Sequence, residues 1–400
     1  MTPRAPLGVY VHFPWCLAKC PYCDFYSVPA ARDAVPHRSY ADAVLAELGR
    51  RRDWLGDREL RSVFFGGGTP SLWDPRELGR VLTGILSAFD GSSAEEITVE
   101  CNPSSLDPAC ARALLDVGVS RLSIGVQSLD ARQLQWLGRL HDPRGALAAL
   151  EAAAAAGTPR VAADLLFGLP GAAPAQAAAE AAALVDHGAS HVSTYALTIE
   201  AGTRFGTLAR AGRLPLAPDD AVADAYFAVA GALSARGLVH YETSNHARPG
   251  EEARHNLGYW WGHEYLGLGA GAWGTVCPSV GAPGVRLRYR NAPSAGDYLA
   301  RAGDWPALPL ERAAPPLVDE VEPIPPETAL SERILLGLRL ATGVDVAREA
   351  SRLGVDPWPP RRERAVEALV ASGRLEREGG VLRVPRQHWF VADNVISRVM

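Results

Sequence analysis

The stretch that decides the fold lies near the start of the chain, where residues 12–25 read HFPWCLAKCPYCDF. It follows a strand-like run over residues 7–13 and spaces Cys16, Cys20 and Cys23 as C-x3-C-x2-C. A structural zinc site takes four cysteine or histidine ligands, usually in pairs, and no fourth cysteine is nearby. A [4Fe–4S] cluster held by three thiolates keeps one iron open for another ligand. The spacing therefore favours such a cluster over zinc, or over cysteines that are merely buried.

The remaining cysteines, Cys101, Cys110 and Cys277, are too scattered for a disulfide framework. Sparse cysteines with one tight cluster are typical of a reducing compartment and indicate metal or redox chemistry. The first residues carry no apolar run of signal-peptide type. No apolar run reaches the ~18–20 residues that a membrane span needs. We therefore expect a cytoplasmic protein without a membrane span, which leaves peripheral membrane contact open.

The composition is that of an ordinary globular protein, with 48% hydrophobic and 21% charged residues. At roughly 100–200 residues per domain, the 400 residues predict two or three domains. The net charge is −5, and arginines and acids nearly balance over residues 345–388. A negative or balanced charge argues against a dedicated nucleic-acid binder. We therefore expect no nucleic-acid partner.

The first 245 residues alternate strand-like and helix-like segments. Strands are predicted over residues 7–13, 62–65, 97–100, 121–126, 161–167, 191–197 and 239–243, and helices over 38–52, 75–89, 107–117, 143–156, 174–187 and 219–236. Alternation of this kind gives parallel βαβ units, and six or more units point to a barrel or part of one. Periodicity alone leaves a doubly wound sheet open.

After residue 245, the amino-acid composition of the chain changes twice. A glycine- and aromatic-rich stretch with little helical periodicity precedes a segment that holds seven prolines and four acids, which predicts a stiff, solvated linker. Three helices over residues 327–341, 345–353 and 361–372, with a hairpin over 375–384, then predict a winged-helix-like domain, and a last helix follows over 388–399. The predicted division is a barrel over 1–245, an extension over 246–305, a linker over 306–326 and a helical domain over 327–400.

Further motifs follow the predicted strand ends in order. Residues 64–70 read FFGGGTP, 100–103 read ECNP, 123–128 read SIGVQS, 137–141 read LGRLH and 164–171 read DLLFGLPG. Consecutive glycines let the backbone approach a ligand closely, and polar residues at the carboxyl ends of parallel strands build the sites of barrels. Each motif taken singly could also have a capping or buried structural role. Together with the cysteine pattern, they resemble the radical S-adenosylmethionine (SAM) superfamily, and within it the oxygen-independent coproporphyrinogen III oxidase family, over residues 7–398.

This resemblance implies an α/β fold, a radical SAM partial (βα) barrel followed by a C-terminal helical, winged-helix-like domain. It implies a [4Fe–4S] cluster on the three cysteines, with SAM on the open iron. Arg139 would pair with the methionine carboxylate, which suits a guanidinium, and Glu100 and Gln127 would face the ribose or methionine moieties. The positions that match SAM contacts in the family are Tyr10, Tyr22, Gly68, Thr69, Glu100, Gln127, Arg139 and Asp164.

Two branches of that family differ in function, the HemN-type oxidases and the HemW-type haem chaperones. The oxidases carry a further cysteine where this chain has Phe25, and a long segment ahead of the cluster loop where this chain has nine residues before Tyr10. Both differences favour the chaperone branch, which implies haem binding and haem delivery to acceptor proteins. Oxidative decarboxylation of coproporphyrinogen III is the second hypothesis, and a radical SAM reaction on another substrate is the third. No catalytic residue is assigned, and whether the protein is an enzyme stays open.

Residues 254–260 read RHNLGYW, which resembles the H-N-x-x-Y-W motif of the chaperone branch. By that resemblance His255, Asn256, Tyr259 and Trp260 hold haem. A histidine can ligate haem iron, and aromatic rings can stack on a porphyrin; a hydrogen-bonded histidine in a turn is the alternative for His255. Trp273 stands where members of this branch commonly have a histidine, so this chain must do without that side chain as a ligand.

Overall fold

Six parallel strands that follow one another in chain order form the centre of a larger sheet. The computed structural model describes residues 5–279, 284–303 and 317–400. The strands run in the order β1-β4-β5-β6-β7-β8 without a reversal, whereas a doubly wound sheet reverses its strand order. The fold is therefore the partial barrel, and the doubly wound alternative is wrong. The six strands are β1 (Ala5–Phe13), β4 (Arg58–Gly67), β5 (Glu96–Cys101), β6 (Arg121–Gln127), β7 (Arg160–Phe167) and β8 (His191–Ala196).

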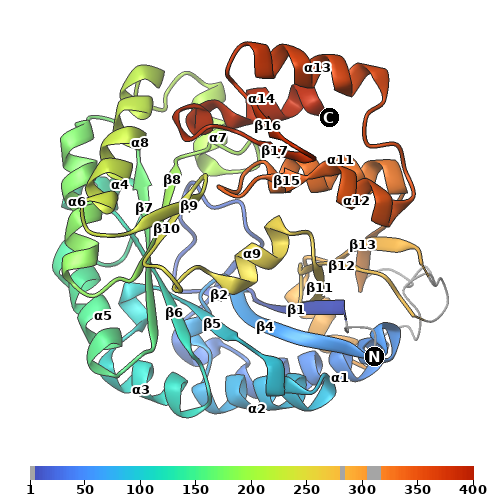
Figure 1. Cartoon of the computed structure of the whole chain (residues 1–400). Helices are drawn as coiled ribbons and strands as arrows, with labels where there is room; N and C mark the ends of the chain where they lie inside the picture. Colours follow the sequence, from blue (N-terminus) through green and yellow to red (C-terminus); the bar gives the residue numbers. More distant parts are fainter. Residues whose placement is uncertain (1–4, 280–283, 304–316) are drawn as a thin grey trace.

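Helices cover the outer side of this curved sheet (Figure 1). The sequence predicted the six long helices but missed two short ones, because six or seven residues are too few to show a helical period. The long helices are α1 (His37–Leu55), α2 (Pro75–Ala88), α3 (Pro108–Asp116), α5 (Pro143–Ala155), α6 (Pro174–Asp186) and α8 (Asp219–Ser234), and the short ones are α4 (Ala131–Trp136) and α7 (Arg204–Arg210).

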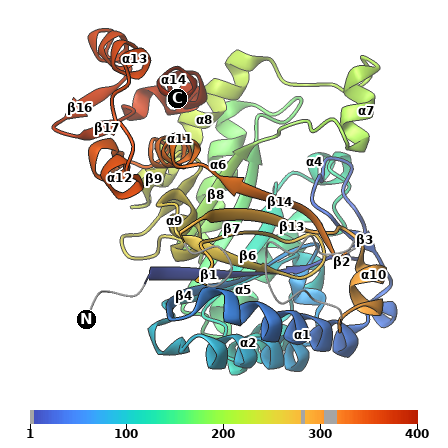
Figure 2. The same ribbon diagram turned by 90° about the vertical axis from the view of Figure 1, so that its right-hand side faces the viewer.

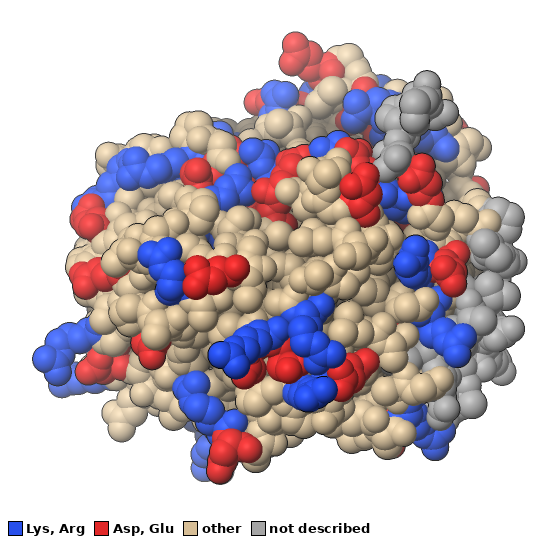
Figure 3. Space-filling model, turned by 90° about the horizontal axis from the view of Figure 1, so that it is seen from below, with Lys and Arg blue, Asp and Glu red and all other residues tan. Residues whose placement is uncertain are grey.

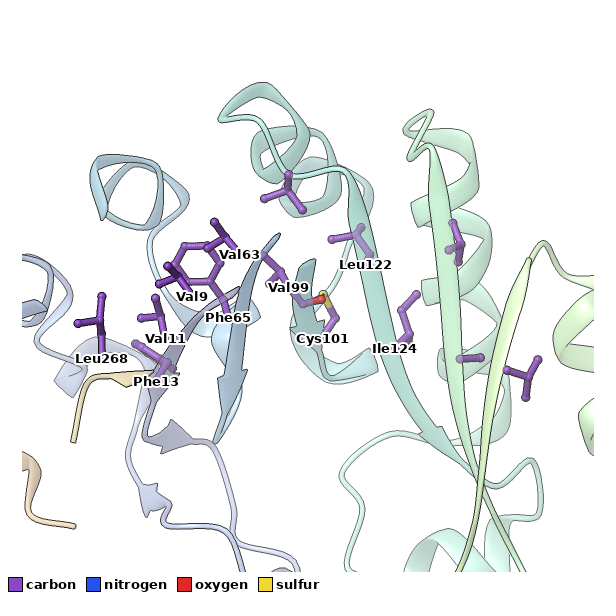
Figure 4. Packing of buried hydrophobic residues seen from close by; sticks show 14 of the residues in the cluster. Val9, Val11, Phe13, Val63, Phe65, Val99, Cys101, Leu122, Ile124 and Leu268 are labelled. Carbon is purple, nitrogen blue, oxygen red and sulfur yellow. The ribbon is translucent and has the colours of Figure 1, made fainter. Parts of the chain in front are cut away.

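Successive side chains along the parallel strands point alternately to the hydrophobic core and to the barrel interior. Successive strand residues point to opposite faces of a sheet, so one set of side chains packs under the helices and the other faces the barrel interior. The set under the helices is apolar, and Figure 4 shows its members from neighbouring strands gathered in one cluster. Among the residues between them along the strands, polar and aromatic side chains such as Tyr10, Glu100 and Asp164 line the interior cavities. The labelled core residues are Val9, Val11, Phe13, Val63, Phe65, Val99, Cys101, Leu122, Ile124 and Leu268.

Further strands extend the sheet at both ends. At one end, β11 pairs in parallel with β1, and β12, β13 and β14 continue in antiparallel fashion. At the other end, β10 pairs in antiparallel fashion with β8, and β9 pairs with β10. The glycine- and aromatic-rich extension thus contains strands that the sequence analysis did not predict. The added strands are β11 (Glu264–Leu268), β12 (Trp273–Val276), β13 (Arg286–Asn291), β14 (Val318–Ile324), β9 (Val239–Glu242) and β10 (Asn245–Ala247).

The predicted solvated linker is wrong over β14. Residues 318–324 pair with β13 as the edge strand of the large sheet, where a proline costs no ladder hydrogen bond on the open side. The acidic residues that suggested a solvated linker face arginines of the neighbouring strand, since Glu322 pairs with Arg288 at 3.2 Å and Asp319 with Arg290 at 3.5 Å. Residues 306–316 of the same prediction lie outside the described residues.

The helical domain packs over one end of the barrel (Figures 1 and 2). Backbone hydrogen bonds tie it down, from Thr243 N–H to the Arg339 carbonyl and from Ala341 N–H to the Tyr241 carbonyl. Its helices and hairpin follow the predicted winged-helix-like plan. The elements are α11 (Pro326–Gly337), β15 (Val344–Asp345), α12 (Val346–Leu353), α13 (Pro360–Ala371), β16 (Glu376–Glu378), β17 (Val381–Arg383) and α14 (Ala392–Val399).

Two further short helices and a small ribbon complete the described structure. The helix α9 (Arg254–Trp260) lies in the concave centre of the sheet in Figure 1 and contacts β4 and α11. The helix α10 (Ala295–Ala300) contacts α1, and β2 (Trp15–Cys16) pairs with β3 (Val28–Pro29). Both helices fall in the extension, where the sequence shows little helical periodicity.

The surface shows no separation of charge on the side seen from below. Basic and acidic side chains intermingle across that face (Figure 3). None of the helices within the described ranges combines the length and the apolar character that crossing a bilayer takes.

Candidate functional site

A cavity of about 480 Å³ lies at the carboxyl ends of the parallel strands. This is the end of a barrel where its strands and loops build sites, and the volume falls in the range of small-molecule pockets. The structure brings the three cluster cysteines together with most of the residues predicted to bind SAM. The predicted residues that line this cavity are Cys16, Cys20, Cys23, Tyr22, Gly68, Thr69, Glu100, Gln127, Arg139 and Asp164.

The cluster loop is closed by the short ribbon of β2 and β3, which pairs Cys16 with Pro29. All three cysteines of the loop are free thiols. Burial raises the pKa of the Cys16 and Cys23 thiols, and metal ligation needs the thiolate, so iron binding would release protons. Among the described residues, no three His, Cys, Asp or Glu side chains converge on one ion. The ligands of a cubane cluster bind different irons and need not converge, so the three thiols fit that group.

The glycine motif at the end of β4 lies against the cluster loop. Backbone N–H groups of Gly68 and Thr69 donate to the carbonyls of Phe13 and Trp15, at 2.7 and 2.8 Å. A Cβ atom on Gly68 would lie 2.6 Å from the backbone of the loop, and Gly67 has a φ of +116°, which favours glycine. These glycines therefore hold the loop and keep the cavity wall free of side chains.

Two carboxyl groups, Glu100 on β5 and Asp164 on β7, line the cavity from the two strands that flank β6. Glu100 accepts a hydrogen bond from the Gly67 N–H at 3.1 Å, and Asp164 accepts one from the Ser123 hydroxyl at 3.4 Å. Burial, and after it the nearby Asp164 carboxylate, raises the pKa of Glu100 to about 7. Burial also raises the pKa of Asp164. Each of these carboxyl groups still has an oxygen that can accept a hydrogen bond from a hydroxyl or amine group of a ligand.

The end of β6 positions Gln127 and Arg139. Gln127 has a φ of +69°, in the left-handed region that costs a non-glycine residue of order 1–3 kcal/mol. The pairing of β6 with β7 shifts register just before it. The Arg139 guanidinium donates to the Gly125 carbonyl at 2.7 Å and lies 3.7 Å from the Cys20 sulfur. Its Nε is buried without a partner among the described residues, so it retains a donor for an anionic ligand.

We expect Arg139→Ala to weaken SAM binding by roughly 1.5–3 kcal/mol, because the change removes a charge-assisted hydrogen bond to a carboxylate. The measurement is SAM titration by calorimetry on anaerobically reconstituted protein, with iron content as the control for the cluster. Arg132→Ala on α4, an exposed arginine outside the cavity, is the matched variant. Unchanged SAM affinity in Arg139→Ala would contradict the role given to this residue.

A second cavity, of about 520 Å³, adjoins the first. Phe25, Phe64, Glu100 and Asn256 line both. The structure places Tyr10 here rather than in the first cavity, where its hydroxyl donates to Nδ1 of His12 at 2.9 Å. The walls are largely aromatic. The aromatic and histidine side chains that line it are Tyr10, His12, Phe25, Tyr26, Phe64, His255, Tyr259, Tyr265 and Trp273.

His255 is buried between the two residues that hydrogen-bond its ring. Nδ1 lies 2.8 Å from the Ser62 hydroxyl, and Nε2 lies 2.8 Å from the Tyr259 hydroxyl. The ring stacks on Phe64, with centroids 5.0 Å apart. Burial lowers the pKa of His255 to about 4, so the ring is neutral at neutral pH. Ligation of iron by His255 therefore requires one of these hydrogen bonds to open.

The other members of the predicted haem motif separate along α9. Asn256 and Tyr259 line the second cavity with His255. Trp260 does not, because it packs with Tyr241 and Leu340 near the helical domain. Its indole Nε1 is buried without a partner among the described residues. The structure therefore brings three of the four motif residues to one cavity.

Glu96, at the start of β5, holds the first turn of α9 by hydrogen bonds. Its carboxylate accepts hydrogen bonds from the backbone N–H groups of Arg254 and His255, at 3.0 and 3.1 Å. It also pairs with Arg160 at 2.9 Å and lies 4.0 Å from the buried Arg121 guanidinium. This carboxylate thus joins the sheet to the helix that carries the haem motif.

Sequence reasoning missed several residues that line the two cavities. Ser193 and Tyr195 lie on β8 and line the first cavity; the strand-end rule applied to the predicted strand could have found Tyr195, which is near its carboxyl end. His12 and Tyr26 flank the cysteine motif, but no spacing marks them. Arg290 comes from β13, which the sequence did not predict.

Comparisons with known proteins agree with this geometry. The Radical SAM superfamily model matches residues 10–202, and the HemN C-terminal domain model matches residues 324–391. The solved structure of coproporphyrinogen III oxidase (HemN) from Escherichia coli matches with a TM-score of 0.79 at 18% identity, over 99% of this chain and 90% of that one. That likeness establishes the shared fold.

Relatives named Heme chaperone HemW match most of the chain. The protein from Mycobacterium tuberculosis is 36% identical over 100% of this chain and 96% of its own length. The one from Escherichia coli is 38% identical over 69% of this chain and 72% of its own, and the one from Bacillus subtilis is 32% identical over 87% of each. With its radical SAM barrel and HemN-type C-terminal domain, the chain belongs to the HemW family of radical SAM proteins.

Proposed function

We propose that the protein binds haem and delivers it to acceptor proteins, and that it carries a [4Fe–4S] cluster with SAM beside it. The observation that carries the proposal is the pair of adjoining cavities. The three cysteines line one, and His255, Asn256 and Tyr259 line the other. The name of the relatives, Heme chaperone, supports haem as the cargo.

In the first cavity, Cys16, Cys20 and Cys23 would hold the cluster. A cluster with one open iron supplies reductive chemistry on SAM when both are bound. The protein's own part is to bind and orient. The Arg139 guanidinium offers a fork for a carboxylate, and Glu100, which lines the same cavity, would accept hydrogen bonds from the ligand.

In the second cavity, aromatic rings would pack against the porphyrin and His255 would ligate its iron. His255 Nε2 would then have to give up its hydrogen bond with the Tyr259 hydroxyl. The Ser62 hydroxyl at Nδ1 can remain and orient the ring, as partners of metal-bound histidines commonly do. Asn256 lies between the two cavities and can hydrogen-bond to ligands in either.

The second candidate is oxidative decarboxylation of coproporphyrinogen III. The adjoining cavities favour it as well, because they would bring a porphyrinogen next to SAM. Phe25 counts against it, since it stands where the oxidases carry a further cysteine and its exposed ring lines both cavities. The two functions therefore differ in whether the tetrapyrrole is released unchanged.

We expect reconstituted protein to bind haem stoichiometrically and to leave coproporphyrinogen III unconverted, even with SAM and a strong reductant. His255→Ala should shift the haem Soret band or weaken binding, because it removes the proposed iron ligand. Asn256→Ala should have a smaller effect, since an amide only orients or hydrogen-bonds. Ser62→Ala should also have a smaller effect than His255→Ala, because it removes only the bond that orients the ring at Nδ1 and keeps the imidazole.

The assay mixes reconstituted protein, coproporphyrinogen III, SAM and reductant, and measures protoporphyrinogen. Turnover on the order of one per second, or even a hundredfold slower, would overturn the chaperone proposal and favour the oxidase. Absence of haem binding by the unmodified protein would also overturn it.

A further inference from the structure

We propose that the second cavity binds its tetrapyrrole by a carboxylate side chain, with Arg290 as the partner of that carboxylate and Trp273 as the aromatic wall beside it. This inference rests on the proposed haem binding and adds an orientation to it. It assigns a role to two residues of β12 and β13 that lie outside the haem motif.

Arg290 is the only cationic side chain among the described residues that line this cavity. The two histidines of the cavity are neutral at neutral pH, since burial lowers the pKa of His12 and of His255 to about 4. The two acids, Asp24 and Glu100, repel an anion when they are ionised. A ligand that carries carboxylates therefore has one favourable place for them, the Arg290 end of the cavity.

Arg290 and Trp273 are direct neighbours across two strands. They are register partners between β13 and β12, and the guanidinium lies 5.4 Å from the indole centroid. The indole is 37% exposed, unusual for so large an apolar ring, and it lines the cavity. A cation over an aromatic face is held in place by the ring. The pair thus combines a flat apolar surface with a fixed positive charge, which suits a flat ring bearing an acid.

The present partners of Arg290 can be exchanged for a ligand. Its ion pairs reach Asp319 at 3.5 Å and Glu320 at 3.9 Å, and both acids are about half exposed. Solvent-exposed pairs of this kind contribute about 0–1 kcal/mol. The Arg290 Nε is buried and has no partner among the described residues. A bidentate carboxylate would satisfy donors that the two exposed acids leave weakly paired or unpaired.

The other residues that line the second cavity indicate toward which side the bound tetrapyrrole would extend. Phe25 and Asn256 line both cavities, on the side toward the cluster cysteines, whereas Trp273 and Arg290 line only the second. A macrocycle anchored by its acid at Arg290 would therefore extend toward Phe25 and the first cavity. His255 and Tyr259, which line the same cavity, would then be among the residues that contact the macrocycle.

The test compares haemin with haemin dimethyl ester, which lacks both free carboxylates. Each is titrated into the full-length reconstituted protein, and the Soret band reports binding. We expect the unmodified protein to bind haemin at least about tenfold more tightly than the ester. Arg290→Gln should weaken haemin binding by a similar factor and leave ester binding nearly unchanged. Arg290→Lys should restore part of the preference for the acid.

Arg288→Gln is the matched control. It lies two positions away on the same face of β13, pairs with Glu322 and Glu332, and lines neither cavity. It should bind both haemins as the unmodified protein does. Circular dichroism verifies that each variant is folded, and if Arg290→Gln does not fold, the comparison of acid and ester in the unmodified protein decides.

Equal affinity of the unmodified protein for acid and ester would overturn this inference and leave the haem proposal standing. Haemin binding that Arg290→Gln does not change would do the same. No binding of either compound by the unmodified protein would overturn both proposals.

Discussion

Cys20→Ala is expected to abolish iron–sulfur cluster assembly, with Cys16→Ala and Cys23→Ala giving the same result. Three thiolates are the whole protein ligand set that the cluster loop offers, and a cube that keeps one open iron has no thiolate to spare. Arg139 lies 3.7 Å from the Cys20 sulfur, so loss of this ligand also removes a contact between the loop and the SAM wall. The measurement is iron and sulfide content after anaerobic reconstitution, together with visible absorbance. We expect about four irons in the unmodified protein and a near-zero value in each variant.

Cys101→Ala is the sharpest control, because Cys101 also borders the first cavity. Its sulfur lies 3.6 Å from the Val99 carbonyl and belongs to the apolar cluster under the helices. Alternation along β5 thus turns it away from the cavity, while Glu100 faces inward. Cys110→Ala and Cys277→Ala should likewise retain the cluster. Full loss of iron in Cys101→Ala would replace the three-ligand assignment with a four-ligand one.

The barrel could be predicted from the sequence because its signals are local. Alanine-rich helices, strand-like runs and motifs at strand ends recur in order, and each is visible within a few residues. The edge strand β14 was missed because its prolines and acids, taken alone, resemble a solvated linker. Only the partner strand explains them, since Arg288 and Arg290 of β13 supply the opposite charges. Non-local pairing of this kind leaves no trace in the segment itself.

The residues of the candidate site also fall into those that local sequence signals predict and those that only the tertiary structure reveals. The spacing of the cysteines suggested the cluster, and the family resemblance suggested the SAM positions, whereas the predicted haem motif lies on a helix that the sequence did not predict. Once α9 is known, His255 and Tyr259 fall four positions apart on one face, and Trp260 turns away from it. The pairing of Trp273 with Arg290 depends on the register of two unpredicted strands. Residues brought together by tertiary register therefore had to come from the structure.

Glu96→Ala is expected to lower the free energy of unfolding by about 3–5 kcal/mol, the range for breaking a buried ion pair by removing one partner. The change leaves Arg160 and the 2% exposed Arg121 side chain without this carboxylate. It also removes the acceptor of the first two backbone N–H groups of α9. Urea denaturation monitored by circular dichroism measures the difference. Glu96→Gln should lose less, because its amide oxygen still accepts a hydrogen bond.

Glu95→Ala is the matched control, since it removes the same side chain one position earlier. Glu95 pairs with Arg61 on the surface, where both side chains are more than 40% exposed, and an exposed pair contributes about 0–1 kcal/mol. Equal losses in the two alanine variants would show that Glu96 does not anchor α9 as described. The two effects of Glu96 can be separated in Glu96→Gln. If α9 depends on the carboxylate for its position, haem affinity should fall in this folded variant, because His255 is held by the backbone N–H that donates to Glu96.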